Sequence, residues 1–554
     1  MLKRKKIFRI FFWILAGFAG LLLVLFIYLY AVAIDHPPAI KDRSSEALQR
    51  VDHGNGFYTL GNNWFRKSNS GLYELYVEGD AFERGVINGK LTHELVRRQE
   101  DHFNEQITKL VPSNFYRHFL KYFIGWFNRH LNENVTEEYR ESIYGVSMAA
   151  SEEYNYIGSN YQRILNYHAA HDIGHALQTM ALVGCTSFGT WGNRSADSTM
   201  IIGRNFDFYA GDKFAEDKIV AFFDPTQGHR YMTVTWGGFL GTVSGMNETG
   251  LSVTINAAKT AMPSASATPV SLVATEILQY ASNIKEALAI ASKRKMFVSE
   301  SFLIGSAADK KAIVIEKTPT QLSVYDPLEN FIECANHFQS DSLSNSPKNL
   351  EQLKESASPY RYQRLTQLLA ADTINTVQKT IDILRDTKGI NNADIGIGNE
   401  KALNQLIAHH SIVFEPQKRL VWVSTSPWQF GKFMAYDLNK IFSMHGMKEN
   451  KEIYDSTLTI AADTFLLTKQ YNNFLTYRKL KQQADAGKEV NIQTLVASNP
   501  NYYHSYVIAG DYLYRQEKYK DALHYYQIGL TKEIATEKEA DHIRKQIEKC
   551  RQEL

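Results

Sequence analysis

A long apolar stretch near the N-terminus limits how the chain can be arranged. From Ile10 to Ile34 there are 25 residues without a charged side chain. As a helix, at about 1.5 Å per residue, this stretch would be roughly 37 Å long, more than the ~30 Å hydrocarbon core of a bilayer requires. Basic residues occupy positions 3–6, and a basic flank predicts that the N-terminus stays inside while the remainder is exported.

A cleaved signal peptide is the alternative to this membrane anchor. Ala31-Val32-Ala33 would then serve as the cleavage site. The apolar regions of signal peptides are usually about 7 to 15 residues long, so the length favours an uncleaved anchor. Under both interpretations we expect a periplasmic or extracellular body.

Length and charge indicate several folded units with a surface of mixed sign. The chain has 554 residues, and its 61 basic and 59 acidic side chains give a formal net charge of +2. This balance gives no reason to expect a nucleic acid partner. The three cysteines, at positions 185, 334 and 550, would make a poor disulfide framework, because one pair would leave a thiol over.

Composition and pattern divide the chain into six segments. They are a basic flank over 1–9, the anchor over 10–34, a polar linker over 35–50, an α part over 51–184, a β part over 185–446 and a helical extension over 447–554. Strands are expected over 72–77, 200–206, 231–236 and 251–256, with further hairpins between 302 and 424. Helices are expected over 90–109, 136–156, 160–181, 271–293 and 360–384. This alternation predicts an α+β fold, with sheets packed face to face and covered by helices.

No strand is expected beyond about Met447, where the pattern becomes helical and charged. Part of this extension lies close to the spacing of a tetratricopeptide repeat, at Tyr506, Ala509, Gly510, Tyr519, Ala522, Tyr526 and Gly529. One such repeat cannot bury its own apolar face, since about three are usually needed. The extension therefore either docks on the main domain or presents a surface to a protein partner.

A histidine-rich segment raises the question of a metal site. His168, His171 and His175 would share one face of a helix, and three imidazoles with Asp172 nearby could bind zinc. Gly174 interrupts this helix, and the spacing matches no recognised zinc motif. We therefore expect no metal and no cofactor, and a zinc amidase remains as an alternative.

A lone cysteine follows a glycine at Cys185, and the chain continues into a polar turn and an apolar strand that ends in Arg204 and Asp207. A strand returning beside Cys185 would bring this cation and this carboxylate to the thiol. A thiol with its ordinary pKa of ~8.5 needs a base or a cation to become a nucleophile, and no histidine lies between residues 185 and 207. Cleavage of the bond between Gly184 and Cys185 would free an α-amino group with a pKa of about 7.7 to 8.0, which can act as the base. The alternative is a cysteine buried as a small hydrophobe.

Five motifs in order carry a family resemblance. They are G-C-T-S-F from Gly184, G-R-N-F-D-F from Gly203, G-M-N-E-T-G-L-S-V-T-I-N from Gly245, A-N-H-F from Ala335 and S-P-Y-R-Y-Q-R-L from Ser358. Over about residues 70 to 440 the chain resembles the N-terminal nucleophile (Ntn) hydrolases of the acyl-coenzyme A:6-aminopenicillanate acyltransferase group, which is related to choloylglycine hydrolase and acid ceramidase. The resemblance implies a four-layer αββα fold and autoproteolysis before the cysteine.

The resemblance also implies roles for single residues. Cys185 is similar in position to the nucleophile, and Arg204 and Asp207 to the pair that holds the new amino group. Asn256 and Asn336 resemble residues with oxyanion contacts, and Arg361, rather than Arg364, resembles an arginine that lines the site. The alternatives are a structural ion pair between Arg204 and Asp207, turn-capping asparagines, and a solvent-exposed Arg361.

The substrate is predicted only as a class. Trp236 and Phe239 lie in the turn W-G-G-F-L-G, which could line an apolar acyl pocket or belong to a core hairpin. The mechanism predicted is attack of Cys185 on a linear N-acyl amide, such as an acyl-amino acid or lipid amide, through a thioester. Water would make the protein a hydrolase, and a second amine would make it an acyltransferase. A membrane-tethered scaffold that acts through its helical tail, without catalysis, is the alternative.

Overall fold

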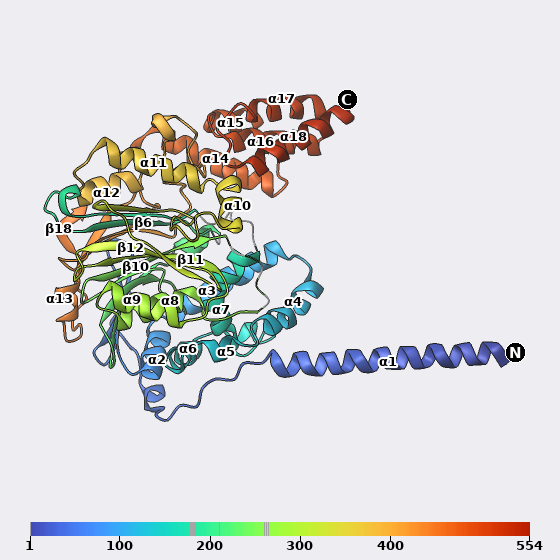
Figure 1. Ribbon diagram of the computed structural model, residues 1–554, viewed down its shortest axis with the longest axis horizontal. Helices are drawn as coiled ribbons and strands as arrows, with labels where there is room; N and C mark the ends of the chain where they lie inside the picture. The colour runs from blue at the N-terminus through green and yellow to red at the C-terminus, as the bar shows by residue number, and fades with distance from the viewer. Residues whose placement is uncertain (1, 178–183, 210, 260, 262, 264) are drawn as a thin grey trace.

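The N-terminal helix stands apart from the rest of the protein. The computed structural model describes residues 2–177, 184–209, 211–259, 261, 263 and 265–554. Helix α1 (Leu2–Val32) projects from the body and exposes its apolar side chains (Figure 1). Its portion Phe8–Val32 is long and apolar enough to cross a membrane, and a signal sequence meets the same criteria. The predicted apolar helix is confirmed, while the side of the membrane on which the body lies stays a prediction.

Two sheets form the centre of the body in the part of the chain that the structure describes. The larger sheet has the order β1-β2-β3-β4-β7-β8-β9-β10-β11-β12-β13. Its strands are β1 (Val51–Asp52), β2 (Phe57–Leu60), β3 (Asn63–Lys67), β4 (Tyr73–Gly79), β7 (Ile219–Pro225), β8 (Tyr231–Thr235), β9 (Ser244–Asn247), β10 (Leu251–Ala258), β11 (Ser299–Ser306), β12 (Lys311–Lys317) and β13 (Leu322–Tyr325). Strands β4 and β7 pair in parallel and join the segment before Cys185 to the segment after it.

The smaller sheet has the order β14-β5-β6-β15-β16-β17-β18. Its strands are β14 (Phe331–Cys334), β5 (Thr186–Thr190), β6 (Ile201–Phe206), β15 (His410–Glu415), β16 (Leu420–Ser424), β17 (Phe433–Asp437) and β18 (Asp455–Ile460), and each pairs antiparallel with its neighbours. Strand β18 lies beyond residue 447, so the prediction that the strands end there is wrong. This edge strand is exposed or half-buried along its length, and its apolar alternation is short, because only Leu458 and Ile460 alternate with threonines.

Apolar clusters separate four layers, which are helices, larger sheet, smaller sheet and helices (Figure 1). The cluster between the sheets joins side chains such as Phe222 and Val234 of the larger sheet to Ile412 and Val423 of the smaller one. The outer face of the larger sheet is covered by α2 (Ala81–Leu91), α3 (His93–Leu110), α6 (Glu137–Ser147), α7 (Asn160–Leu177), α8 (Val270–Tyr280) and α9 (Ile284–Lys293). The outer face of the smaller sheet is covered by α11 (Ser358–Ala371) and α12 (Val377–Leu384). The predicted mixed α/β body is confirmed.

Two long predicted helices are each broken in two. The expected helix 271–293 is split into α8 and α9, because the Asn283 side chain accepts a hydrogen bond from Glu286 N at 3.0 Å and starts a new helix. The expected helix 360–384 is split into α11 and α12, where Thr376 caps the second helix by accepting from Lys379 N at 3.2 Å. Because the apolar periodicity continues across both breaks, it does not reveal the capping residues at which the second helices begin.

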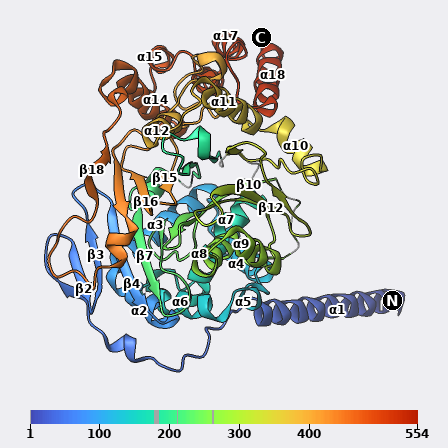
Figure 2. The same cartoon turned by 60° about the vertical axis from the view of Figure 1, so that its left-hand side comes forward.

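The C-terminal extension is helical and docks on the body. It contains α14 (Lys469–Asp485), α15 (Ile492–Ser498), α16 (Tyr503–Arg515), α17 (Tyr519–Gly529) and α18 (Glu537–Gln552), on the side of the molecule away from α1 (Figures 1 and 2). Helices α16 and α17 pack closely because Gly510 leaves room for the ring of Tyr526. Asn499 exchanges two hydrogen bonds with the main chain of Ile397, at 3.2 and 2.8 Å. The extension therefore supports the loop 396–406, and its resemblance to a tetratricopeptide repeat stays a prediction.

A buried ion network joins the two sheets at one edge, and it provides a stability test. Arg66 Nη1 on β3 lies 2.9 Å from the fully buried carboxylate of Glu74 on β4, which also accepts from the Tyr436 hydroxyl of β17. Arg66→Met would leave the Glu74 charge buried without its cation, and we expect a loss of about 3 to 5 kcal/mol of unfolding free energy. Chemical denaturation measures this loss.

Two further variants control the test. Adding Glu74→Gln to Arg66→Met should recover much of the stability, because the fully buried carboxylate is then gone, and Glu452, the other carboxylate that Arg66 binds, is partly exposed. Arg551→Met, which removes an exposed pair with Glu548, should leave the midpoint unchanged. Equal effects of the Arg66 and Arg551 substitutions would contradict the role of the network.

Candidate active site

Strand pairing brings the predicted nucleophile and its neighbours together. Cys185 is buried directly before β5, and β5 pairs with β6 so that Ser187 lies opposite Arg204. Arg204 Nη2 lies 3.7 Å from Cys185 Sγ, and the thiol lies 3.9 Å from the main-chain oxygen of Asp207. The cation and the acidic residue therefore return beside the cysteine, as the spacing predicts.

Arg204 connects the nucleophile to both sheets. It extends from β6 and donates to Val243 O at 3.0 Å, to the Ser244 hydroxyl and to Ile255 O. Its side chain is fully buried, and in the described part of the chain no ion pair joins it to Asp207. The alternative of a structural Arg204–Asp207 ion pair is therefore not what the structure has.

Asp207 is a buried carboxyl group whose hydrogen-bonding capacity is unused. Neither carboxylate oxygen has a hydrogen-bond partner among the described residues. Burial raises the pKa of Asp207 to about 7, although the nearby cations Arg361 and Arg204 lower it in part. Such a group can accept a hydrogen bond that no described residue donates.

The Cys185 thiol is not activated in the uncut chain. Burial raises the pKa of Cys185 to about 11, and the Arg204 guanidinium opposes this rise only in part. The thiol is thus protonated at neutral pH, and its reaction requires a base beside it.

The peptide between Gly184 and Cys185 is held on both sides. Gly184 N donates to Asp207 O at 2.9 Å, and Gly184 O accepts from Gln405 Nε2 at 2.8 Å. A Cβ atom at position 184 would lie 2.2 Å from Gln405 Nε2, which explains the glycine before the cysteine. Sequence reasoning missed Gln405, since it lies in a loop distant in the chain and belongs to no quoted motif.

The two asparagines predicted as oxyanion donors already donate to main-chain carbonyls. Asn256 Nδ2 bonds to Cys334 O and Ala335 O at 3.0 and 3.2 Å, and Asn336 Nδ2 bonds to Ala257 O at 2.9 Å. These contacts join the end of β10 to the end of β14, and neither side chain caps a turn. The oxyanion role of both residues stays a prediction, because it requires an N–H group to be directed to the substrate.

Arg361 is part of the same buried group, whereas Arg364 is not. Arg361 donates to Asn336 Oδ1 at 2.7 Å and to the main-chain oxygen of Glu400 at 3.0 Å, and it is buried rather than exposed to solvent. Arg364 instead forms an ion pair with Asp386 at 2.8 Å. The structure thus brings Arg361, and not Arg364, to Asn336, while the role of Arg361 in lining the site stays a prediction.

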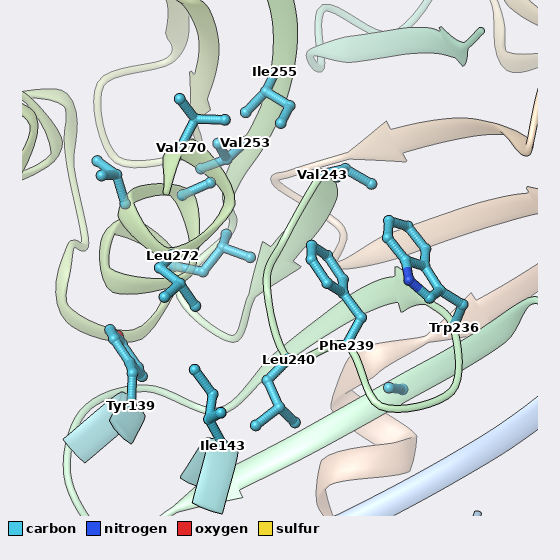
Figure 3. Close-up of a cluster of buried hydrophobic side chains, with 14 of the residues drawn as sticks. Tyr139, Ile143, Trp236, Phe239, Leu240, Val243, Val253, Ile255, Val270 and Leu272 are labelled. Carbon is cyan, nitrogen blue, oxygen red and sulfur yellow. The ribbon is translucent and has the colours of Figure 1, made fainter. Parts of the chain in front are cut away.

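Trp236 and Phe239 lie in the core beneath the larger sheet (Figure 3). Their rings stack with centroids 4.1 Å apart, and they belong to the buried cluster that also contains Cys185. Both side chains are nearly inaccessible in this state. The observation favours the core hairpin over an open pocket, and a role in substrate binding stays a prediction.

A second polar network adjoins Arg204 and was not predicted. His409 Nδ1 and His410 Nδ1 are 2.9 Å apart, and His410 Nε2 is 2.9 Å from the Ser244 hydroxyl that Arg204 also contacts. Burial lowers the pKa of both histidines well below the usual range, so the rings are neutral. Glu300, also missed, is fully buried, and burial raises its pKa well above the usual range. The sequence could have pointed to the two histidines, because they are adjacent at the start of a strand. No feature of the sequence pointed to Glu300.

The histidine-rich helix does not offer His168 to a metal. His168 Nδ1 lies 2.8 Å from Ile164 O, and Nε2 accepts from Leu240 N at 2.9 Å, so both ring nitrogens are used. The side chains of His171 and His175 lie outside the described residues. Within the described residues, no group of three or more histidine, cysteine, aspartate or glutamate side chains could hold a metal ion.

A buried cysteine beside an arginine and an unsatisfied carboxyl group, where two sheets meet between helices, is the arrangement expected of an N-terminal nucleophile enzyme. Residues 194–426 match the model of the family described as acyl-coenzyme A:6-aminopenicillanic acid acyl-transferase. The matched segment begins after Cys185 and contains Arg204, Asp207 and Arg361. The match confirms the resemblance to this family, whose class acts on amide bonds.

Other similar proteins match part of the chain. An uncharacterized protein of Archaeoglobus fulgidus is 23% identical over 271 residues, which cover 46% of this chain and 45% of that protein. The chain thus spans less than half the length of this curated relative.

Two solved structures are also similar over part of the chain. A Caenorhabditis elegans orthologue of N-acylethanolamine-hydrolyzing acid amidase has 18% identity and a TM-score of 0.31, over 42% of this chain and 93% of its own. A mutant of the conjugated bile acid hydrolase of Clostridium perfringens has 14% identity and a TM-score of 0.33, over 48% of this chain and 95% of its own. Both TM-scores are low, so the fold is defined by the layers of this chain and not by these structures.

The charge state of Asp207 predicts a pH dependence of stability before cleavage. The folded chain binds the Asp207 proton more tightly than the unfolded chain, so stability falls as pH rises from about 4 to about 7. A rise in pKa from 3.8 to about 7 corresponds to on the order of 4 kcal/mol above pH 7. In a Cys185→Ala chain that cannot be cut, Asp207→Asn should therefore increase the unfolding free energy at pH 8 and leave it nearly unchanged at pH 4. Urea titrations at pH 4 and pH 8 measure the unfolding free energies of the two chains. An effect of Asp207→Asn that is the same at both pH values would contradict the prediction.

Proposed function

We propose that the protein is a cysteine amide hydrolase or acyltransferase that matures by cutting the bond between Gly184 and Cys185. The observation that carries this proposal is the Asp207 carboxyl group, which is buried beside Cys185 and has no hydrogen-bond partner in the described part of the uncut chain. Cleavage would place a new amino group on Cys185. That group would supply the donor that Asp207 lacks, and it would supply the base that the thiol lacks.

Maturation consumes one water molecule. Cys185 Sγ attacks the Gly184 carbonyl carbon, the peptide nitrogen leaves as the α-amino group, and a thioester joins Gly184 to Cys185. The thiol proton ends on the leaving nitrogen, and the proposed carrier is the ionised form of Asp207, whose pKa is about 7. Water then hydrolyses the thioester and releases the Gly184 carboxylate and the Cys185 thiol.

Turnover repeats this chemistry on a linear N-acyl amide. The Cys185 amino group accepts the thiol proton, and the sulfur attacks the amide carbonyl. The amine leaves with that proton, and the acyl group remains on sulfur as a thioester. Water completes hydrolysis, and a second amine completes acyl transfer. Asn256, Asn336 and Arg361 are the groups proposed to bind the oxyanion or line the site.

An acyl-amino acid or lipid amide is the substrate class that suits the surroundings of Cys185. The cysteine adjoins an apolar cluster that includes Trp236 and Phe239, which favours an acyl chain over a polar group. Helix α1, if it stays attached as an anchor, would hold the enzyme at a membrane on the exported side. The proposal treats Trp236 and Phe239 as acyl contacts once the site opens.

The test is the intact mass and N-terminal sequence of the purified protein. The wild type should yield a fragment that begins at Cys185, and Cys185→Ala should stay whole. Cys334→Ala provides a matched control, because this second buried, free cysteine lies outside the proposed chemistry, and its variant should be cut like the wild type. A wild-type chain that stays whole after incubation from pH 5 to pH 8 would refute autoproteolysis and favour the non-catalytic scaffold.

A further inference from the structure

The carbonyl group that maturation would attack has its own hydrogen-bond donor. Gln405 Nε2 lies 2.8 Å from Gly184 O, and both residues are buried. A carbonyl oxygen can only accept, so the side-chain amide must direct its N–H group at it. The charge that develops on this oxygen during attack by Cys185 would be stabilised by such a donor.

The loop that carries Gln405 is fixed from several sides. Asn404 N donates to Asp386 O at 2.8 Å, and Leu406 N donates to the Asn404 side chain at 3.1 Å. Earlier in the same loop, Asn399 Nδ2 donates to Glu533 O at 2.9 Å in the C-terminal extension. A donor held in place before the reaction is more effective than one that must be ordered during it.

We propose that Gln405 is the oxyanion donor for the cleavage of the Gly184–Cys185 bond. This inference rests on the proposed maturation and adds the residue that polarises the reacting carbonyl. It assigns a catalytic role to a loop residue outside all the motifs that identify the family. It also explains why residue 184 has no side chain, since a Cβ atom would displace the donor.

The experiment compares cleavage rates of full-length chains by pulse-chase synthesis. Gln405→Met keeps the length of the side chain and removes the donor, and it should slow cleavage by about 10²- to 10³-fold. Gln405→Glu places a carboxylate against the carbonyl and should be at least as slow. Gln429→Met is the matched control, because Gln429 is also fully buried and its side-chain amide has no partner in the described part of the chain. Melting temperatures of the uncut chains show whether each variant is folded.

The outcomes separate this inference from the function on which it rests. Slow cleavage in a folded Gln405→Met chain, with normal cleavage in Gln429→Met, supports the role of Gln405. Cleavage of Gln405→Met at the wild-type rate overturns that role and leaves the maturation intact. A wild-type chain that is never cut overturns both. Equal slowing in Gln405→Met and Gln429→Met would assign the effect to packing and overturn the donor role.

A second, independent observation concerns the exposed face of α4 (Asn114–Phe127). Phe115, Phe119 and Phe123 recur at every fourth residue and expose between 46% and 78% of their surfaces, and Tyr116 lies beside them. A surface helix in water normally shows its polar face to solvent, and α4 shows an aromatic one. We name these four residues the aromatic face of α4.

This helix packs against the C-terminal end of α1. Phe26 and Tyr122 have ring centroids 6.0 Å apart, and Gly125 packs so closely on Ala33 that a Cβ atom there would lie 2.5 Å from Ala33 Cβ. Figure 1 shows α4 beside the point where α1 leaves the body. If α1 spans a bilayer, α4 therefore lies at the level where the chain emerges, and aromatic side chains are enriched at that level.

We infer that the aromatic face of α4 inserts into the bilayer surface beside the anchor. Arg117 and Lys121 lie on the same helix, and both are held by main-chain carbonyls, since Arg117 donates to Val111 O at 2.8 Å and Lys121 to Tyr156 O at 3.1 Å. The insertion therefore depends on the aromatic side chains. The anchor and α4 would then fix the orientation of the body on the membrane, rather than leave it on a flexible tether.

Spin labels on the full-length protein in phosphatidylcholine–phosphatidylglycerol vesicles test this contact. The three native cysteines are buried, so a label introduced by Phe119→Cys reports on α4 alone. It should be more accessible to oxygen, which concentrates in lipid, than to a water-soluble nickel chelate. Leu328→Cys, at a fully exposed position on the turn before β14, is the control and should show the opposite preference. The same preference at both positions, or spin–spin broadening that shows α4 packed on a second copy, would overturn the inference.

Discussion

The buried guanidinium of Arg204 is the interaction on which the site depends. It extends from the smaller sheet and donates to the main chain at Val243 and Ile255 of the larger sheet, and it also contacts the sulfur of Cys185. A buried cation is costly unless its donors are satisfied. These acceptors offset much of the cost, although Nε of Arg204 has no hydrogen-bond partner among the described residues. The same contacts fix the two sheets relative to each other at the point where the nucleophile lies. The Arg204 side chain therefore both holds the two sheets together and positions the Cys185 thiol.

Two buried acidic groups beside Arg204 have raised pKa values. Burial raises the pKa of Asp207 to about 7 and that of Cys185 to about 11, so both favour the neutral form. Under the proposed maturation, the new amino group of Cys185 would donate to Asp207 and would act as the base for the thiol. The loop 396–406 also links this centre to the C-terminal helices, because it bonds to Arg361, Gly184 and Asn499. The helical extension is thus part of the support of the site.

Local patterns predicted the secondary structure where the residue pattern is long and regular, and failed where tertiary contacts decide. The apolar composition of α1 and the alternation in β10 are visible in the sequence, and both elements form. The breaks at Asn283 and Thr376 depend on single capping bonds that periodicity does not record. Strand β18 forms because β17 offers it an edge, and its own sequence carries only a short alternating run over residues 457–460.

The sequence by itself determined that Cys185, Arg204 and Asp207 meet, since a short antiparallel return brings residues of one hairpin together whatever surrounds it. Only the tertiary structure decided the rest of the site. It brought Gln405 to the carbonyl of Gly184 and directed the amide of Asn256 to the main-chain oxygens of Cys334 and Ala335. Contacts between distant loops depend on how layers pack, and packing is a property of the whole chain that no local spacing encodes.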